Sequence, residues 1–257
     1  MELIDTHCHL AHGRLRQDVP AALARARQAG VTNIICAASD LVEAKTCLGL
    51  TREHEGLHFT AGVHPHEAKN AGEGYLDELQ RLAAEPRCVA VGEIGLDYHY
   101  DFSPRDVQRR VFSEQIALAG RVGKTIVIHT REAFEDTMAI IASAGADGGR
   151  IVFHSFTEGP DMGRRVLDIG AAISFSGIVT FKNSDELRRT AALVPDDRLL
   201  IETDAPYLSP EPVRKMKTNE PANVAHVAAA LAAARGTTVE AIAEITTRNA
   251  KRVFALR

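Results

Sequence analysis

The sequence predicts a single (β/α)8 TIM barrel, an α/β fold in which eight parallel strands alternate with helices. Short strand-forming runs alternate with helical patterns from end to end, and most of these runs are continuously apolar, as in parallel strands covered by helices. The length of 257 residues is close to the ~250 residues usual for this fold. An open doubly wound sheet is the alternative, but it would need a glycine-rich turn after the first strand, where the chain has HCHLAHG.

Eight segments carry the strand pattern. From the N-terminus they are LIDTH (3–7), NIICAA (33–38), LHFTAGV (57–63), CVAVGEI (88–94), TIVIH (125–129), RIVFH (150–154), AAISFS (171–176) and RLLIET (198–203). No linker or low-complexity segment interrupts the series, so we expect one domain over residues 1–257.

Helix boundaries can be read from capping residues. The first helix should end before Gly30, a natural residue to follow a helix C-terminus, and the sixth should end at Gly170 in the same way. Ser103 is expected as the N-cap of a long helix, with Pro104 at its first position. The one long irregular stretch, residues 209–223, follows the last strand, and loops of this length are usually functional or disordered.

Composition limits the function and the location. The net charge of −4 argues against a broad basic surface that coats nucleic acid, although a few arginines would suffice to recognise a strand end. The four cysteines form no CxxC pair, which favours reduced thiols. Glu2 and Asp5 stand where a signal peptide would be basic and then apolar, and the apolar stretch 224–234 is too short to cross a bilayer. We therefore expect a cytoplasmic protein that does not associate with membranes.

Histidines and carboxylates stand at the predicted strand ends. In a (β/α)8 barrel the residues that perform chemistry lie at the C-terminal ends of the strands. The residues found there are His7, His9, His64, Glu93, His129, His154 and Asp204. Each alone has an ordinary explanation as a rim, capping or ion-pair residue. Burying them together without an ion would cost on the order of several kcal/mol per charge, so the set predicts a metal site.

The first two histidines indicate how such a site would be built. His7 and His9 are two residues apart, so on an extended backbone they face the same side and can bind one ion, while Cys8 points the other way and should be buried. Imidazoles combined with carboxylates suit Zn²⁺ and Mn²⁺, and the oxygen ligands also allow Mg²⁺.

Eight motifs along the chain together resemble a known family. They are DTHCHL, GVHPH, GEIGLDY, IHTREA, FHSFTEG, ISFSGIVTF, IETDAPYL and NEPANV. In this order they are similar to the TatD-type metal-dependent deoxyribonucleases, a branch of the amidohydrolase superfamily, over the whole chain. The resemblance implies a (β/α)8 barrel with one to three divalent ions that hydrolyses phosphodiesters, typically as an exonuclease on DNA.

The resemblance also implies a set of metal ligands. The matching residues are His7, His9, Glu93, His129, His154 and Asp204. The first two would hold one ion with Asp204, and Glu93 would bridge to a second ion held by His129 and His154. Many amidohydrolases bridge their ions with a carbamylated lysine, but Lys124 stands at the wrong end of its strand, which favours the glutamate bridge.

The expected reaction is two-metal hydrolysis of a phosphodiester, with single-stranded DNA or a 3′ end as the substrate. Asp204 would be both ligand and general base, and Glu93 the bridging carboxylate. Neutral His64 would contact the scissile phosphate or an extra ion, with His66 beside it. The cations expected to neutralise phosphate oxygens, unless they are only solvated surface charges, are Arg131, Lys182 and Arg214. Without Trp and with 5% aromatic residues, strand binding should be short and tolerant of sequence.

Two other functions remain open. The same ions could open an ester or amide bond in a small molecule or in a mischarged aminoacyl-tRNA. A non-catalytic scaffold barrel would be favoured by a lost ligand, and none is lost. No obligate protein partner is evident from the sequence.

Overall fold

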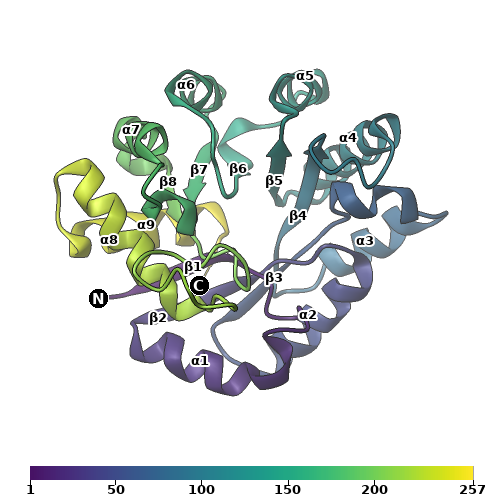
Figure 1. Ribbon diagram of the computed structural model, residues 1–257. Helices are drawn as coiled ribbons and strands as arrows, with labels where there is room; N and C mark the ends of the chain where they lie inside the picture. The colour runs from purple at the N-terminus through teal and green to yellow at the C-terminus, as the bar shows by residue number, and fades with distance from the viewer. Residues whose placement is uncertain (257) are drawn as a thin grey trace. The chain divides into compact units, whose positions relative to one another are not determined.

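The computed structural model describes residues 1–256, so Arg257, the last residue of the predicted domain, lies outside the described residues. Strands and α-helices alternate along this part of the chain (Figure 1). The strands are β1 (Leu3–Cys8), β2 (Val31–Cys36), β3 (Leu57–Ala61), β4 (Cys88–Asp97), β5 (Thr125–Arg131), β6 (Ile151–Phe153), β7 (Ala172–Phe175) and β8 (Leu199–Ile201).

The helices follow the strands as the sequence predicts. They are α1 (Val19–Gln28), α2 (Leu41–Glu53), α3 (Tyr75–Ala83), α4 (Arg105–Val122), α5 (Phe134–Ala144), α6 (Pro160–Asp168), α7 (Asp185–Leu193), α8 (Val224–Arg235) and α9 (Val239–Val253). The strand order in the sheet is β1 to β8 in sequence, and the registered strand pairs are parallel. The predicted (β/α)8 fold class is therefore confirmed. Within residues 1–256, no helix combines the length and the apolar character needed to span a membrane.

The chain divides into two compact units. The first unit comprises residues 1–36 together with the chain from His154 onward, and the second comprises residues 37–153. A single domain over residues 1–257 stays a prediction.

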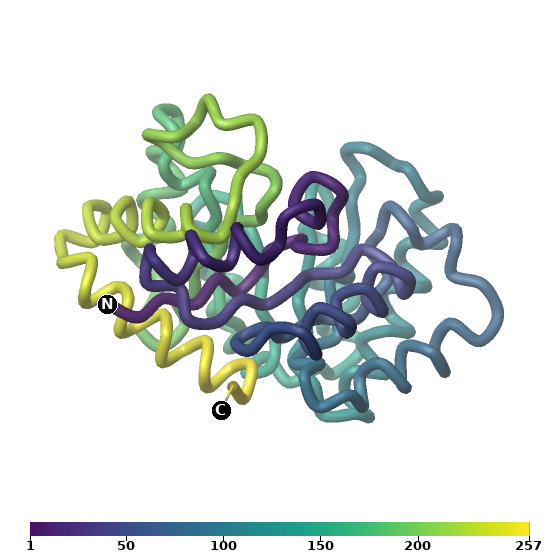
Figure 2. The backbone as a smooth tube through the Cα atoms, turned by 90° about the horizontal axis from the view of Figure 1, so that it is seen from below, coloured from purple at the N-terminus to yellow at the C-terminus, as the bar shows by residue number. Residues whose placement is uncertain are grey.

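In the first unit, the end of β1 lies beside the segment that follows β8. Cys8 forms a parallel bridge with Ala205, and His9 N donates to Ala205 O at 2.7 Å. All six residues of β1 are buried, Cys8 among them, as predicted. Figure 2 shows the beginning of the chain beside the C-terminal helix α9, where Lys251 Nζ lies 2.8 Å from a Glu2 carboxylate oxygen. Residues that stand far apart in the sequence thus meet around β1.

In the second unit, β4 and β5 approach each other closely. Their register pairs Gly95 with His129, and a Cβ at Gly95 would lie 1.9 Å from the His129 carbonyl oxygen. Gly95 also has φ +145°, a conformation that L side chains rarely adopt. Glycine at this position therefore permits the contact that brings the ends of β4 and β5 together.

One predicted helix cap is wrong and two are confirmed. Helix α4 begins at Arg105, its N-cap residue is Pro104, and no side chain caps it. Ser103 instead donates its hydroxyl to His66 O at 2.9 Å and accepts from Lys69 N, because the preceding loop turns toward residues 66–69. Gly30 and Gly170 follow the ends of α1 and α6 with φ +89° and +86°, as predicted.

Candidate metal centres

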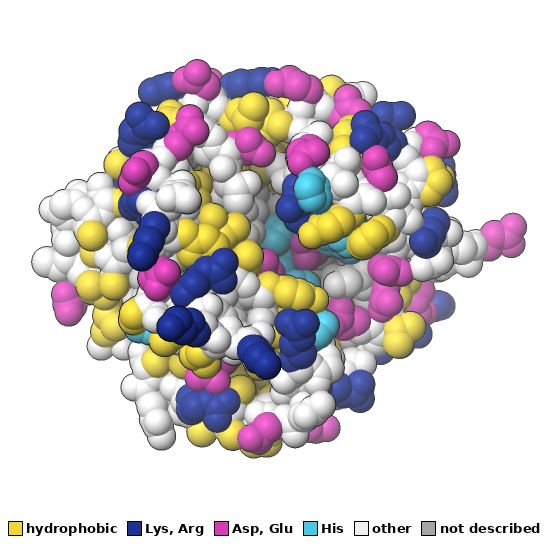
Figure 3. Space-filling view, viewed as in Figure 1, with side chains coloured by type: hydrophobic (Ala, Val, Ile, Leu, Met, Phe, Trp, Pro, Cys, Tyr) yellow, Lys and Arg dark blue, Asp and Glu magenta, His cyan; other side chains and the backbone are white. Residues whose placement is uncertain are grey.

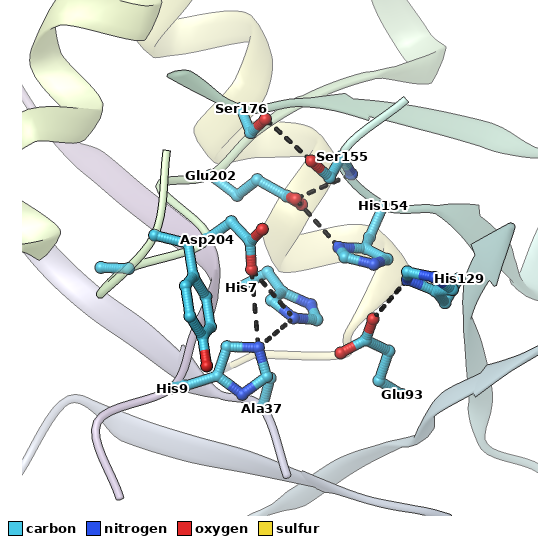
Figure 4. A network of polar contacts seen from close by, with 12 residues as sticks. His7, His9, Ala37, Glu93, His129, His154, Ser155, Ser176, Glu202 and Asp204 are labelled. Carbon is cyan, nitrogen blue, oxygen red and sulfur yellow. Dashed lines mark hydrogen bonds and ion pairs between the residues drawn. The ribbon is translucent and has the colours of Figure 1, made fainter. Parts of the chain in front are cut away.

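In the first unit, three predicted ligands converge on one point (Figure 4). His7 and His9 stand at the end of β1, and their Nε2 atoms are 3.2 Å apart. Asp204 follows β8, and its Oδ1 lies 3.8 Å from His7 Nε2 and 3.5 Å from His9 Nε2. Both imidazoles are buried, and the Asp204 side chain is 15% exposed.

The spacing of these three atoms fits a divalent cation. Ligand bonds of about 2.0–2.2 Å with angles of about 90–120° at the ion place neighbouring ligand atoms roughly 2.8–3.8 Å apart. Burial alone would raise the pKa of the Asp204 carboxyl, but its hydrogen bond with His9 and the charges of His7, His9 and His154 outweigh burial and lower it. The carboxylate is therefore ionised and ready to coordinate.

The backbone around Asp204 holds the carboxylate in an uncommon conformation. Asp204 has φ +55°, in the left-handed region that few residues other than glycine, asparagine and aspartate occupy. Its N–H donates to His7 O at 2.9 Å. One residue earlier, Thr203 donates both its N–H and its hydroxyl to the buried carboxyl of Asp5, which also accepts from His7 N. These bonds tie the ends of β1 and β8 together, which fixes Asp204 relative to the histidines.

His154 lies beside this group and is oriented by a second carboxylate. Glu202 Oε1 accepts from Ser155 N at 2.8 Å and lies 3.2 Å from His154 Nδ1 (Figure 4). Because a carboxylate accepts, Nδ1 carries the proton in the neutral ring and Nε2 keeps its lone pair for an ion. The His154 ring also stacks on His7, with centroids 4.1 Å apart.

In the second unit, a separate group forms around Glu93. Its Oε1 lies 2.9 Å from His129 Nδ1 and 3.3 Å from His64 Nε2. Figure 4 shows the Glu93 carboxylate facing the His129 ring. The Glu93 side chain is 4% exposed, so its charge needs a partner. Its distance of 2.9 Å from His129 Nδ1 matches that between two ligands of one ion.

Asp97 selects the nitrogen of His129 that can bind an ion. Its Oδ2 lies 3.1 Å from His129 Nε2 and 2.9 Å from His66 Nε2. Burial would raise the pKa of the Asp97 carboxyl, but hydrogen bonds with His129, His66 and the Tyr100 N–H lower it far below its usual range. The ionised carboxylate accepts from His129 Nε2, so Nδ1, the atom that faces Glu93, is left with the lone pair.

His64 has the opposite tautomer. Its Nδ1 accepts from His66 N at 3.1 Å, so in the neutral ring Nε2 carries the hydrogen. Burial lowers the pKa of His64 to about 4, against the opposing charge of Glu93, which keeps the ring neutral near pH 7. His64 is therefore built as a hydrogen-bond donor, which suits the predicted substrate contact better than metal coordination.

The predicted substrate-binding residues fall in both units. In the second unit, His66 is partly buried against Asp97, and the exposed Arg131 has its guanidinium 4.8 Å from the Tyr100 ring centroid. In the first unit, Lys182 is exposed, and the Arg214 guanidinium lies 4.0 Å from the Phe181 ring centroid. Figure 3 shows Lys and Arg side chains over the segment between β8 and α8.

Two carboxylates that orient ligand histidines were not predicted from the sequence. Asp97 stands four residues after Glu93 in the same strand, and Glu202 stands two residues before Asp204. On a regular extended backbone, such even spacing would place each carboxylate on the same face as the predicted residue. This even spacing is the feature of the sequence that could have indicated both carboxylates.

Comparisons with known proteins show which family and which relatives the chain is similar to. A model of the family described as TatD related DNase matches residues 4–255. A Bacillus subtilis (strain 168) protein named "Uncharacterized metal-dependent hydrolase YabD" is 39% identical over 99% of both chains. An Edwardsiella piscicida protein named "3'-5' ssDNA/RNA exonuclease TatD" is 35% identical over 99% of this chain and 100% of its own. The crystal structure of YJJV, a TatD homologue from Escherichia coli K12, has a TM-score of 0.93 at 29% identity and covers 99% of this chain and 98% of its own.

Proposed function

Since the chain belongs to the family of TatD related DNases and is a metal-dependent hydrolase, we propose that it is an exonuclease that removes nucleotides from the 3′ end of single-stranded DNA. The observation that carries the proposal is the pair of buried His and carboxylate groups whose ligand atoms have the spacing of divalent-cation sites. The Edwardsiella relative, named as an exonuclease on single-stranded DNA and RNA, supports the choice of substrate. A cytoplasmic location stays a prediction.

We assign the ions to the chain's own side chains as follows. His7, His9 and Asp204 hold one ion, and Glu93 and His129 contribute to a second. That His154 is also a ligand of the second ion, through Nε2, stays a prediction. When bound, such ions, whether Mg²⁺, Mn²⁺ or Zn²⁺, supply Lewis-acid activation of water and neutralise charge on the phosphate. The bridging role of Glu93 and the number of ions stay predictions.

The protein's own groups then move the proton and hold the substrate. Asp204 is the general base, because one of its carboxylate oxygens lies 3.5 Å from His9 Nε2 and a carboxylate has a second oxygen that can accept a proton. His64 donates its Nε2 hydrogen to a phosphate oxygen, and its low pKa keeps it a neutral donor. Arg131, Lys182 and Arg214 supply positive charge for the strand.

An assay with three substrates tests the proposal. The metal-reconstituted protein is given a labelled single strand, a D-aminoacyl-tRNA and a generic phosphodiester. We expect stepwise shortening of the strand from its 3′ end. Hydrolysis of the aminoacyl ester without shortening of the strand would contradict the exonuclease and favour a deacylase.

Removal of metal should abolish the activity reversibly. We expect chelation to stop strand hydrolysis and re-addition of a divalent ion to restore it, with Mn²⁺ more effective than Mg²⁺ because imidazole ligands prefer softer ions. The rate is measured before chelation, after it, and after each ion is added back. Full activity in excess chelator, with no metal found by elemental analysis, would refute the metal sites.

Removal of the cationic side chains should weaken binding in a salt-dependent way. We expect Lys182→Ala and Arg131→Ala each to raise KM for the strand several-fold, because each removes one contact with a phosphate. Each lost contact should also reduce the magnitude of the slope of log K against log salt by about 0.7, the value for a single strand. Binding is measured between low and moderate salt, with the exposed Arg52→Ala as a matched control. An unchanged slope in both variants would place the phosphate contacts elsewhere, such as residues 209–223.

A further inference from the structure

Two aromatic side chains are exposed beside the Glu93 group of the second unit. Tyr100 is 47% and Phe102 is 54% exposed, both in the loop between β4 and α4. Their rings stack with centroids 5.2 Å apart and planes 20° from parallel. Among residues 1–256, the one other aromatic residue with comparable exposure is Tyr207, at 43%. Figure 3 shows hydrophobic and histidine side chains adjoining on the visible face.

The loop that carries this pair is held in place by several bonds. Asp97 Oδ1 accepts from His99 N at 3.0 Å and from Tyr100 N at 2.9 Å. Lys69 Nζ donates to the carbonyl oxygen of Phe102 at 2.9 Å. The two exposed rings are therefore presented by an ordered backbone, which lowers the entropy lost when a ligand stacks on them.

The pair is connected to the candidate metal ligands through one carboxylate. Asp97 uses its other oxygen, Oδ2, to bind His66 and His129. The His66 ring lies edge-on to both exposed rings, with centroids 5.5 Å from Tyr100 and 4.8 Å from Phe102. A ligand on the pair would thus lie next to the side chains that we assign to substrate and metal.

A cation completes the surface. The guanidinium of Arg131 lies 4.8 Å from the Tyr100 ring centroid, and Arg131 is exposed. A purely apolar ligand would not interact with the guanidinium charge. A nucleotide has both a flat π surface for the rings and an anionic phosphate for the guanidinium. The chemistry of the surface therefore fits a nucleotide.

We propose that Tyr100 and Phe102 form a stacking platform for the base of the terminal nucleotide, with Arg131 contacting a phosphate beside it. The inference rests on the proposed exonuclease function and adds the residues that position the strand end. Every base has a π face, so such a platform accepts all four bases, in keeping with short and sequence-tolerant binding.

A comparison of two substrates and two proteins tests the platform. The substrates are strands that end in a normal nucleotide or in an abasic one. The proteins are the wild type and Tyr100→Leu/Phe102→Leu, which keeps apolar bulk but removes the π faces. For the wild type, loss of the base should raise KM by roughly 5- to 150-fold, the range for one base stacked on an aromatic side chain. For the double variant, the two strands should have the same KM. Val42→Ala, an exposed apolar position on α2, serves as the control.

The outcomes separate the two proposals. If the wild type hydrolyses both strands with equal KM, the platform is refuted while the exonuclease stands. If the wild type hydrolyses neither strand, the exonuclease fails, and the platform fails with it. If the double variant does not fold, Phe102→Leu alone is measured, because more than half of that side chain is exposed.

A binding measurement provides a readout independent of turnover. The strand carries 2-aminopurine as its terminal base. Both proteins carry Asp204→Asn, which slows hydrolysis so that binding can be measured on the uncut strand. Stacking quenches this fluorophore, so binding should quench it with Tyr100 and Phe102 present and leave it bright without them. Equal quenching in both backgrounds would overturn the platform.

Discussion

Asp204→Asn should lower kcat by roughly 10²–10⁴-fold, the range for loss of a positioned general base, while the protein keeps its fold and much of its metal. Asparagine retains one carbonyl oxygen in the place of the Asp204 oxygen that lies 3.5 Å from His9 Nε2. It cannot accept the proton that the attacking water loses. The kcat value and the metal content by elemental analysis are measured on the same preparation.

The backbone makes asparagine the informative substitution. Asp204 has φ +55°, a conformation that asparagine tolerates better than alanine or a branched residue. The N–H of residue 204, which donates to His7 O, is also unchanged. A fall in kcat in this variant therefore reports chemistry rather than a distorted loop.

Two further variants complete the experiment. Asp185→Asn makes the same chemical change at an exposed residue at the start of α7 and should leave kcat unaltered. His9→Ala should instead lose metal affinity first, with activity partly restored by excess ion. Near wild-type kcat in Asp204→Asn would show that another group takes the proton, with His64 as the next candidate.

The fold and the grouping of the candidate ligands were predictable because local patterns encode both. Continuous apolar runs mark buried parallel strands, and the residue at the end of such a run lies at the sheet edge whatever the details of packing. Position alone therefore singled out His7, His9 and Glu93, which the structure places in candidate metal-binding groups. Strand ends were less predictable. Strand β4 extends to Asp97, three residues beyond its predicted end, because its last residues continue the parallel pairing with β5, where Asp97 lies opposite Arg131.

The features of the site that the sequence did not predict depend on contacts between residues that are far apart in the sequence. The local sequence predicts Ser103 as a helix cap, but its hydroxyl donates to His66 O, 37 residues away in the sequence. Glu202 orients His154, although the two residues are 48 positions apart in the sequence. The tautomer of His64, which makes it a donor, depends on one backbone N–H in a short turn. Such contacts leave no local pattern in hydropathy, so only the three-dimensional arrangement reveals them.

Glu93→Gln should lower kcat/KM by about 10²–10³-fold, since loss of an ion's contribution costs several kcal/mol of transition-state stabilisation and each 1.36 kcal/mol is a factor of ten. Glutamine keeps the shape of Glu93 but not the charge that faces His129 Nδ1 at 2.9 Å and His64 Nε2 at 3.3 Å. The matched control is Glu53→Gln, at the exposed end of α2, which should behave as wild type.

Thermal unfolding separates loss of an ion from loss of structure in this variant. Without metal, Glu93→Gln should have a Tm equal to or above that of the wild type, because a neutral amide is cheaper to bury than a carboxylate that is 4% exposed. With a divalent ion added, the wild type should gain more in Tm than the variant, since a ligand stabilises the folded state in proportion to RT ln(1 + [L]/Kd). Equal gains in both proteins would show that Glu93 binds no ion. A lower Tm without metal would show instead that its carboxylate is needed for the fold, through His64 and His129.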